Sequence, residues 1–238
     1  MRNQRRIIER GLGRPIANAS FLLMDGYVRS MQKSGVAMLH TARSFSYYRK
    51  VFYKGQSKSA VLSRLANRSV VDVGCGYTPY AEDSMFRACH NAGIDFYGID
   101  PIIGSNPKFG LKEQLVSRAT GGNGRFNAHP PGINKAISAS AQCLPFEDHS
   151  VDEILCSFLL FVWIKDQDTL ADILGEFLRV LKVNGTIKIY PLHEWRFLNV
   201  SNKRLQDVLA NFNVEQTFVH GAGDFRVTPS LLTEMTVA

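Results

Sequence analysis

The chain has 238 residues, of which 45% are hydrophobic, 11% aromatic and 21% charged, and its formal net charge is +7 at pH 7. This composition excludes a disordered chain, a collagen-like repeat and a disulfide-stapled miniprotein, and the length suits one large α/β domain. Residues 1–67 hold 13 of the 28 Lys and Arg residues but only two of the 21 Asp and Glu residues, so they carry a net charge of +11 against −4 for residues 68–238. A basic segment of this kind is typical of a solvated helical face, or of a surface that meets an anionic substrate or a nucleic acid.

The basic N-terminal quarter predicts helical pieces that break at Gly26, Gly35 and Gly55. Its last piece, residues 57–67, has the spacing of a short amphipathic helix. We expect residues 1–67 to form a basic helical cap on an α/β domain of residues 68–238, with one structural domain overall.

Strands and helices alternate after residue 68. We predict strands over residues 69–73, 95–100, 135–140, 151–160, 186–192, 214–220 and 224–237, and helices over residues 82–92, 167–182 and 202–212. The helix from residue 167 is expected to stop at Asn184-Gly185, and the Gly/Pro/Asn-rich stretch 101–134 to be a long functional or mobile loop. This order predicts an α/β fold with a doubly wound, seven-stranded, mostly parallel sheet that ends in an antiparallel C-terminal hairpin strand.

The sequence shows no membrane span and no metal site. Its longest apolar run, residues 158–164, is strand-sized, whereas a membrane helix needs about 20 residues. The cysteines stand singly and without metal-ligand spacing, which indicates reduced thiols in a cytoplasmic protein. Residues 1–24, rich in arginine, are also similar to an organelle transit peptide.

Two acidic residues at the ends of predicted strands are candidates for binding a ligand. Asp72 ends the first strand just before the turn of Gly74 and Gly76, which lets the backbone approach a ligand closely. Asp100 ends the second strand, where a carboxylate can accept hydrogen bonds from the ribose hydroxyls of an adenosine. An ordinary strand-to-helix turn and a turn residue before Pro101 are the alternatives. Ligands of doubly wound sheets bind at this carboxyl edge.

Four blocks in order carry a family resemblance: VVDVGCG (70–76), GIDP (98–101), SAQCLPFEDHSVDEIL (140–155) and EFLRVLKVNG (176–185). Together they resemble the signature blocks of class I S-adenosylmethionine-dependent methyltransferases, and the LPF block resembles a subgroup acting on small molecules. The resemblance covers about residues 68–192 and implies a Rossmann-like fold with S-adenosylmethionine as cofactor.

The resemblance also implies the residues that would bind this cofactor. Asp72 and the loop of Gly74, Cys75, Gly76, Tyr77 and Thr78 would hold its amino-acid end. Asp100 would take the ribose, with Pro101 and Ile102 on one side of the adenine and Ala141 and Gln142 on the other. Cys156, Ser157 and Phe158 would lie beneath the cofactor and face the acceptor.

The sequence departs from the family pattern at three places. Thr78-Pro79 replaces a common glycine, Ser140 stands where an aspartate is frequent, and residues 101–134 form an insertion. Pro79 also occupies the position of the third glycine of a dinucleotide fingerprint, which argues against a nicotinamide cofactor.

Methyl transfer needs alignment and exclusion of water, and it needs a base only where the acceptor is protonated. Candidate catalytic residues are His193 and Tyr48, with a polar loop histidine and a packing tyrosine as the plain alternatives. Tyr47, Trp163 and His129 are further residues of loops or helices that would close over the site.

The acceptor is expected to be a small molecule. CSFLLFVW (156–163) replaces the Asn/Asp-Pro-Pro-aromatic motif with which relatives of this fold methylate amines of nucleic acids and glutamine, and its apolar side chains suit a flat or apolar acceptor. Two alternatives stay open. One is an RNA methyltransferase that uses residues 1–67, where FSYYRKVFYK (45–54) interleaves aromatic and basic residues. The other is a non-catalytic binding module or partner subunit with this fold.

Overall fold

A mixed sheet forms the centre of the molecule in the computed structural model, which describes residues 6–7, 13–33, 41–105, 107–119, 122–192, 196–197, 199–220 and 230–238. Within these residues the sheet has eight strands in the order β1-β7-β8-β6-β5-β2-β3-β4. The strands are β1 (Arg6–Ile7), β2 (Ser69–Val73), β3 (Asp95–Ile99), β4 (Ala136–Ile137), β5 (Val151–Ser157), β6 (Leu181–Tyr190), β7 (Phe212–Val219) and β8 (Ser230–Val237).

The pairing confirms the predicted fold class. Neighbouring strands run parallel except β8, which pairs antiparallel with both β6 and β7. Seven of the strands correspond to those predicted, and the two-residue strand β1 adds an eighth beside β7. The chain passes from β2 outward to β3 and β4 and then returns to β5 on the other side of β2, so the order reverses between β2 and β5. Doubly wound sheets bind ligands at this switch point.

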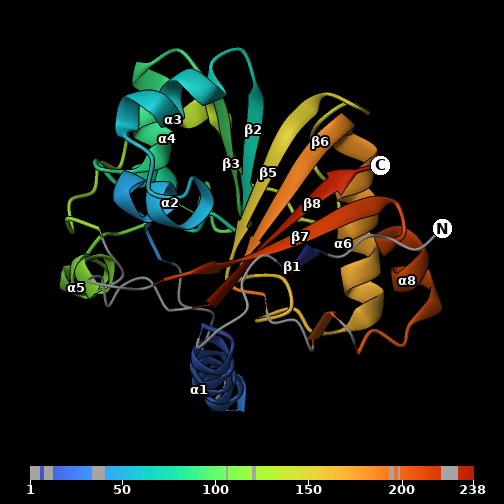
Figure 1. The fold of residues 1–238 in the computed structure, drawn as a ribbon. Coiled ribbons are helices and arrows are strands. Elements are labelled where there is room, and N and C mark those ends of the chain that lie inside the picture. Colours follow the sequence, from blue (N-terminus) through green and yellow to red (C-terminus); the bar gives the residue numbers. More distant parts are fainter. Residues whose placement is uncertain are drawn as a thin grey trace.

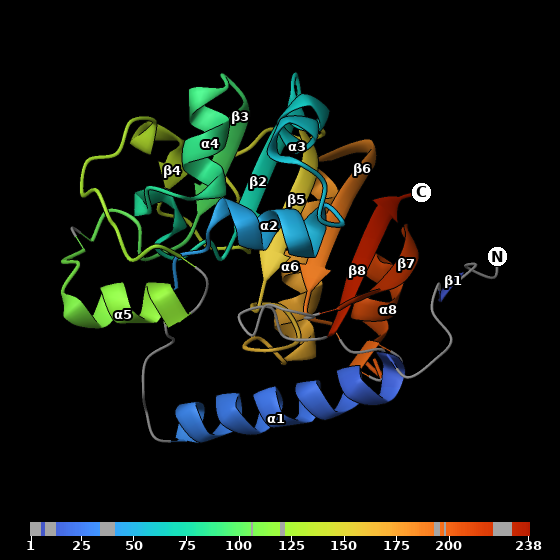
Figure 2. The ribbon, with the colours of Figure 1, turned by 60° about the vertical axis from the view of Figure 1, so that its left-hand side comes forward.

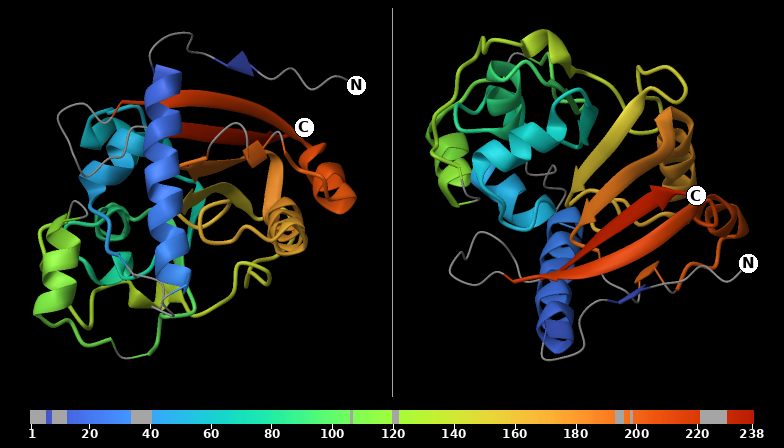
Figure 3. Two further views of the ribbon diagram at one scale, coloured as in Figure 1. Left: turned by 90° about the horizontal axis from the view of Figure 1, so that it is seen from below. Right: turned by 45° about the horizontal axis from the view of Figure 1, so that its top comes forward.

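Helices cover both faces of the sheet (Figure 1). On one face lie α2 (Phe45–Phe52), α3 (Lys58–Leu65) and α4 (Met85–Asn91), and on the other α6 (Gln167–Val180) and α8 (Lys203–Leu209). Alternate residues of each strand point to opposite faces, so both faces are apolar and each is buried under its own helices. The views in Figure 3 show the same two helical layers from other directions.

Serine and asparagine caps fix where several helices begin. The side chains of Ser44, Ser57, Ser84 and Asn202 accept hydrogen bonds from backbone N–H groups in the first turns of α2, α3, α4 and α8. Such caps satisfy donors that have no partner within the helix. They explain why α3, α4 and α8 begin one to three residues later than the sequence pattern alone predicts.

Helix α1 (Gly13–Lys33) runs across the edge of the sheet (Figure 2). It passes through Gly26 without interruption, so the predicted break there is wrong. Because the flanking turns supply helical hydrogen bonds on both sides, one exposed glycine lowers the stability of the helix without ending it. Gly35 lies outside the described residues. Gly55, with a φ of +72°, lies in the turn that follows the end of α2 at Phe52.

Three further predictions need correction. The stretch 101–134, predicted as a loop, contains the helix α5 (Leu111–Ala119). Leucines 111 and 115 of this helix are exposed, so α5 has no apolar face of the kind that predicts a helix from sequence. Helix α6 ends at Val180 and β6 starts at Leu181, so Asn184 and Gly185 lie inside a strand. The register between β5 and β6 shifts there, and Asn184 has a φ of +61°. The predicted third strand is reduced to Ala136–Ile137.

Candidate functional site

The carboxyl ends of β2, β3 and β5 lie next to one another at one edge of the sheet. β2 pairs in parallel with β3 on one side and with β5 on the other. Asp72 on β2, Asp100 directly after β3 and Ser157 at the end of β5 therefore gather where the strand order reverses. Asp72 and Asp100 are buried, and Ser157 is half-buried.

The glycine turn after β2 closes over the end of β3. Gly74 and Gly76 have φ values of +75° and +54°, which other residues rarely adopt. The Gly74 N–H donates to the carbonyl of Ile99 (2.8 Å), and the Gly76 N–H donates to Oδ2 of Asp100 (2.9 Å). Oδ1 of Asp100 accepts from the N–H of Ile102 at 3.0 Å. Asp100 thus anchors the glycine turn through its side chain.

The rest of the loop is held by the segment before α2. The Tyr77 N–H donates to the carbonyl of Thr41 (3.1 Å), and the Thr78 hydroxyl accepts from the N–H of Arg43 (3.1 Å). Thr78 begins a 3-10 turn, Thr78–Tyr80, with Pro79 inside it. Cys75 is buried within the loop, and burial raises the pKa of its thiol well above the ordinary value. A thiol in this state is protonated and inert.

Asp72 is the most perturbed acid of this edge. Its side chain is 1% exposed, and Oδ2 accepts a hydrogen bond from the hydroxyl of Tyr48. Oδ1 is buried and has no hydrogen-bond partner. Burial raises the pKa of Asp72 to about 7, although the Tyr48 hydroxyl and the charge of Arg43 lower it. A buried acceptor without a donor is costly unless a ligand or water supplies one.

Two tyrosines of α2 reach down to the strand ends. Tyr48 and Tyr47 are buried, and the hydroxyl of Tyr47 lies 2.5 Å from Oγ of Ser157. Burial is the main reason why the pKa values of both tyrosines lie above the ordinary value, with Tyr48 shifted further because Asp72 is close. Tyr48 therefore keeps its proton and donates a hydrogen bond to Asp72. This suits a residue that orients the carboxylate better than it suits a general base.

Alternation along β5 separates the three residues expected beneath the cofactor. Ser157 faces α2, whereas Cys156 points to the opposite face and is fully buried in the core beside α6. Burial raises the pKa of the Cys156 thiol to about 12, so the thiol stays protonated. A ligand at the strand ends would therefore contact the backbone of Cys156 and not its thiol. Phe158 is half-buried, has a φ of +59° and packs edge-on against Tyr190.

The four residues expected around an adenine differ in their exposure. Pro101 is exposed and Ile102 half-buried. Ala141 is half-buried against the core, and Gln142 is exposed, with its amide donating to Asp172 of α6 at 3.2 Å. The side chain of Gln142 is thus held by α6 in this structure.

The candidate catalytic histidine cannot be placed. His193, with its neighbours 194 and 195, lies outside the described residues. His129 is exposed, and Trp163 packs partly buried against Phe21 of α1. Among the described residues, no three His, Cys, Asp or Glu side chains gather into a group that can hold a metal ion. No helix in this part of the chain is long and apolar enough to cross a membrane.

Helix α1 lies over the segment that follows β5. Phe21 and Val28 pack against Val162. Between them, Asp25 is 4% exposed and pairs with Lys165 at 2.8 Å and with Arg196 at 2.6 Å. A helix of the basic N-terminal quarter therefore covers the edge where the strand ends meet (Figure 2).

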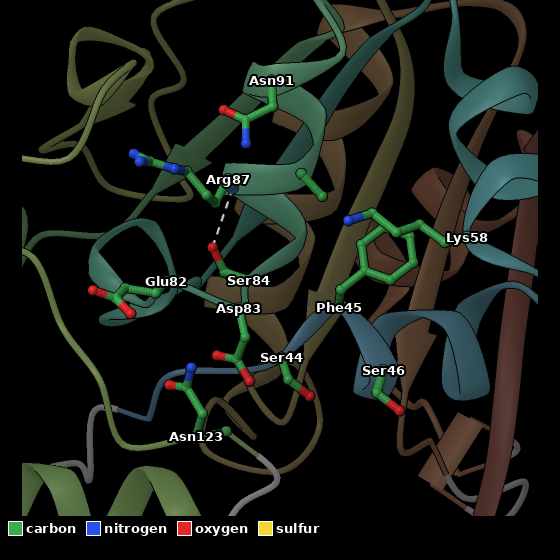
Figure 4. A pocket seen from close by; sticks show the side chains of 12 residues that line it. Ser44, Phe45, Ser46, Lys58, Glu82, Asp83, Ser84, Arg87, Asn91 and Asn123 are labelled. Atoms are coloured by element: carbon green, nitrogen blue, oxygen red, sulfur yellow. Dashed lines mark hydrogen bonds between the residues drawn. The ribbon is translucent and has the colours of Figure 1, made fainter.

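A cavity of about 580 Å³ lies elsewhere, between the starts of α2 and α4 and residues 122–123. Figure 4 shows its mixed lining, which includes Lys58, Glu82, Asp83, Arg87 and Asn91. The dashed line in Figure 4 marks the hydrogen bond that the backbone N–H of Arg87 donates to the hydroxyl of Ser84, which caps α4. None of the strand-end residues described above lines this cavity, so it is separate from the site built on β2, β3 and β5.

The sequence analysis missed Arg43. Its guanidinium carbon lies 4.6 Å from the ring centre of Tyr47 and 4.8 Å from that of Phe158. In the sequence Arg43 is one of many basic residues in the N-terminal quarter, and its spacing does not distinguish it from them. Only the fold brings it to the strand ends.

Residues 71–189 match the family model described as Methyltransferase domain. No protein of curated function matches the sequence. The matched residues begin in β2 and end in β6, so they include both acidic strand ends, the glycine turn and the end of β5.

Solved structures of similar overall fold include three methyltransferase structures. A chain in the complex between the Haloferax volcanii Trm112 methyltransferase activator and a methyltransferase is 18% identical, with 93% of this chain and 97% of that chain covered and a TM-score of 0.43. An S-adenosylmethionine-dependent methyltransferase from Aquifex aeolicus is 12% identical (90% and 98% covered, TM-score 0.43). Another from Thermotoga maritima is 16% identical (92% and 100% covered, TM-score 0.38). At these identities and scores, the likenesses say nothing about the acceptor.

Proposed function

Because the chain belongs to the class I S-adenosylmethionine-dependent methyltransferases, we propose that it binds S-adenosylmethionine at the carboxyl edge of β2, β3 and β5 and methylates a small molecule. The observation that carries the proposal is Oδ1 of Asp72, a buried acceptor without a partner beside the glycine turn. An ammonium group such as that of the cofactor's amino-acid end would supply the missing donor and a compensating charge.

The residues at the neighbouring strand end also fit this cofactor. Each carboxylate oxygen of Asp100 accepts one backbone N–H, from Gly76 or from Ile102. A carboxylate at this strand end can also accept hydrogen bonds from the hydroxyls of a ribose. Gly74 and Gly76 keep side chains away from the loop, which permits close approach of a ligand.

The cofactor, when bound, supplies an electrophilic methyl group that an acceptor displaces in line. The chain's own part is to bind, to align and to exclude water. Asp72, oriented by Tyr48, would fix one end of the cofactor, and Asp100 would fix the other. Phe158 and Trp163, both half-buried, would form an apolar wall on the acceptor side. We further propose that α1 caps this side and that its docking on Val162 shields the reacting atoms from water.

A small acceptor is favoured over a nucleic acid by what surrounds the edge. The segment after β5 is apolar and is covered by α1 through Phe21 and Val28. An RNA strand would hold this cover open during methyl transfer, whereas a small molecule can be enclosed once the cover has closed over it. A steep salt dependence of RNA binding would instead favour the macromolecular acceptor.

Titration calorimetry with S-adenosylmethionine, S-adenosylhomocysteine and NAD tests the proposal. We expect the first two to bind and NAD to give no heat. Asp100→Ala should weaken S-adenosylhomocysteine by about 1–3 kcal/mol, because a charged hydrogen-bond partner is lost and the glycine turn loses its anchor. Asp207→Ala, on the exposed face of α8, is the matched control and should bind like the parent.

The outcome separates the proposal from its rival. If the parent protein binds neither sulfur compound, the methyltransferase proposal fails, and a binding module with this fold takes its place. If Asp100→Ala stays folded and binds as tightly as the parent, Asp100 is not part of the site.

A further inference from the structure

The large apolar side chains that are exposed gather on two helices. Among the residues that the structure describes there are five of them, and four are leucines of α1 and α5: Leu22 (61% exposed), Leu23 (78%), Leu111 (72%) and Leu115 (53%). The fifth, Val183, lies near the start of β6. Exposed apolar residues that gather in this way mark a surface that a partner or a membrane covers.

Helix α5 holds its two leucines away from the domain. Leu111 and Leu115 are four residues apart, so they lie one above the other on the same side of the helix. Arg118, which is also exposed, follows on this side one turn after Leu115. The buried residue of α5 is Ser117, on the side toward the domain. The outer side of α5 therefore presents a leucine pair that ends in a basic residue.

Helix α1 is divided in a similar way. Phe21 and Val28 are seven residues apart, lie on one side of the helix and are buried against the segment after β5. Leu22 and Leu23 point away from that side, as their exposure shows. Lys33 is exposed in the last turn. The outer side of α1, like that of α5, therefore combines leucines with positive charge.

Both helices lie on the same side of the sheet. Figure 2 shows α1 and α5 beyond the carboxyl ends of the parallel strands, and both are in view from below in Figure 3. The candidate site lies at these strand ends, so the two leucine pairs flank it. Val183 lies at the opposite edge, because β6 runs parallel to β5 and Val183 is close to its beginning.

The charge on this side is positive. Each helix contains one acidic residue, Asp25 in α1 and Glu113 in α5. Asp25 is buried and shared by three cations, so it does not offset the positive charge outside. Residues 1–67, which include α1, carry a net charge of +11. The exposed basic side chains of the two helices are Arg29, Lys33, Lys112 and Arg118.

We infer that the outer sides of α1 and α5 form a docking surface for an anionic lipid membrane. The four leucines would enter the boundary between headgroups and acyl chains, while the basic residues would lie against the lipid phosphates. The leucines favour a membrane over RNA, because single strands are bound by basic grooves with aromatic side chains and offer no apolar layer that a leucine can enter.

The docking surface also specifies the acceptor, and this step rests on the proposed function. A membrane on this side would lie next to α1, which covers the apolar segment after β5. A small molecule dissolved in the lipid would then reach the site without crossing water. The acceptor class that suits this arrangement is a lipid-soluble small molecule.

Sedimentation of the full chain with lipid vesicles tests the inference. We expect binding to vesicles of equal parts phosphatidylglycerol and phosphatidylcholine, at least about tenfold weaker binding to phosphatidylcholine alone, and weakening by salt. Replacing Leu22 and Leu23 together with serine should weaken binding to the mixed vesicles about tenfold, because less apolar area enters the lipid. The same replacement of Leu111 and Leu115 should have a similar effect.

Val183→Ser is the matched control. It removes an apolar side chain of comparable exposure (71%) at the opposite edge of the sheet and should bind vesicles like the parent. Circular dichroism should show that all variants keep the native helix content. Titration calorimetry should show that they bind S-adenosylhomocysteine like the parent, since none of the replaced side chains belongs to the cofactor site.

Four results would overturn the inference. They are a parent that does not bind the mixed vesicles, leucine variants that bind them as tightly as the parent, an equal loss from Val183→Ser, and an RNA oligonucleotide that displaces the vesicles and whose own affinity is unchanged in the leucine variants. The proposed function is judged separately by calorimetry. If the parent binds vesicles but not S-adenosylhomocysteine, the docking surface stands while the methyltransferase proposal and the lipid-soluble acceptor fail. If it binds S-adenosylhomocysteine but no vesicles, the proposed function stands and the inference fails.

Discussion

Helices α1 and α2 both cover the carboxyl edge of the sheet, but they are attached in different ways. Five residues of α2 are buried, and tyrosine hydroxyls from α2 and its C-cap reach Asp72, Ser157 and Glu153 in the sheet. Of the side chains of α1 that the structure describes, Phe21, Asp25 and Val28 are buried against the domain, while leucines 22 and 23 are 61% and 78% exposed. The comparison indicates that α2 belongs to the folded core. We expect α1, by contrast, to detach without unfolding the sheet.

The largest expected effect concerns the anchor of α2 in the middle of the sheet. Oε1 of Glu153 accepts from Nζ of Lys188 (3.0 Å) and from the hydroxyl of Tyr53 (2.9 Å), and both charged side chains are buried. Burial alone would raise the pKa of Glu153, but the Lys188 ammonium, together with the Tyr53 hydroxyl and the charge of Arg68, outweighs it and holds that pKa below the ordinary value. Glu153→Gln leaves a buried ammonium unpaired and should lower the free energy of unfolding by about 3–5 kcal/mol in urea titrations.

Two companions make this prediction specific. Glu153→Gln combined with Lys188→Met removes both charges and should restore most of the loss, since a buried pair contributes little beyond its apolar replacement. Asp95→Asn breaks the exposed pair with Lys135 and should change the unfolding free energy by less than about 1 kcal/mol. A loss from Glu153→Gln no larger than that of Asp95→Asn would show that α2 is not anchored through this network.

The second effect concerns the other anchor of α2, at Asp72. The pKa of about 7 in the folded protein lies above that of an unfolded aspartate, near 4. Above pH 7 both states are ionised and the folded state bears the full penalty of the buried charge. As the pH falls from 7 toward 4, the folded state takes up a proton that the unfolded state does not, so this penalty decreases.

Asp72→Asn should therefore raise the free energy of unfolding at pH 8 by about 2 kcal/mol, and the gain should vanish near pH 4. It should also weaken S-adenosylhomocysteine, because a neutral amide cannot compensate an ammonium. Tyr48→Phe is the counterpart, since it removes the donor to Oδ2 and should destabilise by about 1 kcal/mol at pH 8. Urea titrations at the two pH values measure both, and a gain that is the same at pH 4 and pH 8 would contradict the assignment.

The third effect concerns α1, which should respond locally. Asp25 attaches α1 to the domain through Lys165 and Arg196 and also pairs with Arg29 of α1 itself. Asp25→Asn should speed tryptic cleavage after Arg29 about five- to tenfold, while the free energy of global unfolding changes by less than about 1 kcal/mol. Asp207→Asn, which breaks an exposed pair with Lys203, is the control and should leave the cleavage rate unchanged. A large global loss from Asp25→Asn would mean that α1 is part of the core after all.

The two helices also show where prediction from sequence succeeds. Strands β2 and β3 could be predicted together with their ends, because each is an apolar, β-branched or aromatic run that a glycine or an Asp-Pro turn follows. Strand β5 could be predicted too, but the sequence extends it to residue 160, because apolar residues continue beyond its end at Ser157. The acidic residues at two of their ends follow from the same pattern. Parallel pairing then places those ends together, so the position of the candidate site required no tertiary information beyond the fold class.

The contacts that hold α1 and α2 could not be predicted in this way. Asp25 and Glu153 find their partners only after the sheet has formed, since Lys165 and Tyr53 lie far from them along the chain. Arg43 has no spacing signal for the same reason. Gly26 shows the opposite error: the low helix propensity of glycine predicts a break, but the helical turns on both sides of Gly26 keep α1 continuous.

The smallest expected effect concerns two glycines, one in α1 and one in α6, and tests how firmly each helix is attached to the sheet. Gly26 lies exposed inside α1, and a Cβ added there would meet no atom within 4 Å. Gly175, inside α6, offers the same open space, but α6 packs on the central core. Replacing a helical glycine with alanine stabilises the helix by about 0.5–1 kcal/mol, so Gly175→Ala should raise the free energy of global unfolding by that amount.

Gly26→Ala should leave global unfolding unchanged and instead slow tryptic cleavage after Arg29 about two- to fivefold, because it stabilises only the docked helix. Urea titration and timed proteolysis of the two variants measure both quantities side by side. Equal gains in global stability from both alanines would show that α1 unfolds together with the sheet. A gain confined to proteolysis for Gly26→Ala, with the reverse for Gly175→Ala, would mean that the cover of the site opens on its own, as entry of an acceptor beneath α1 requires.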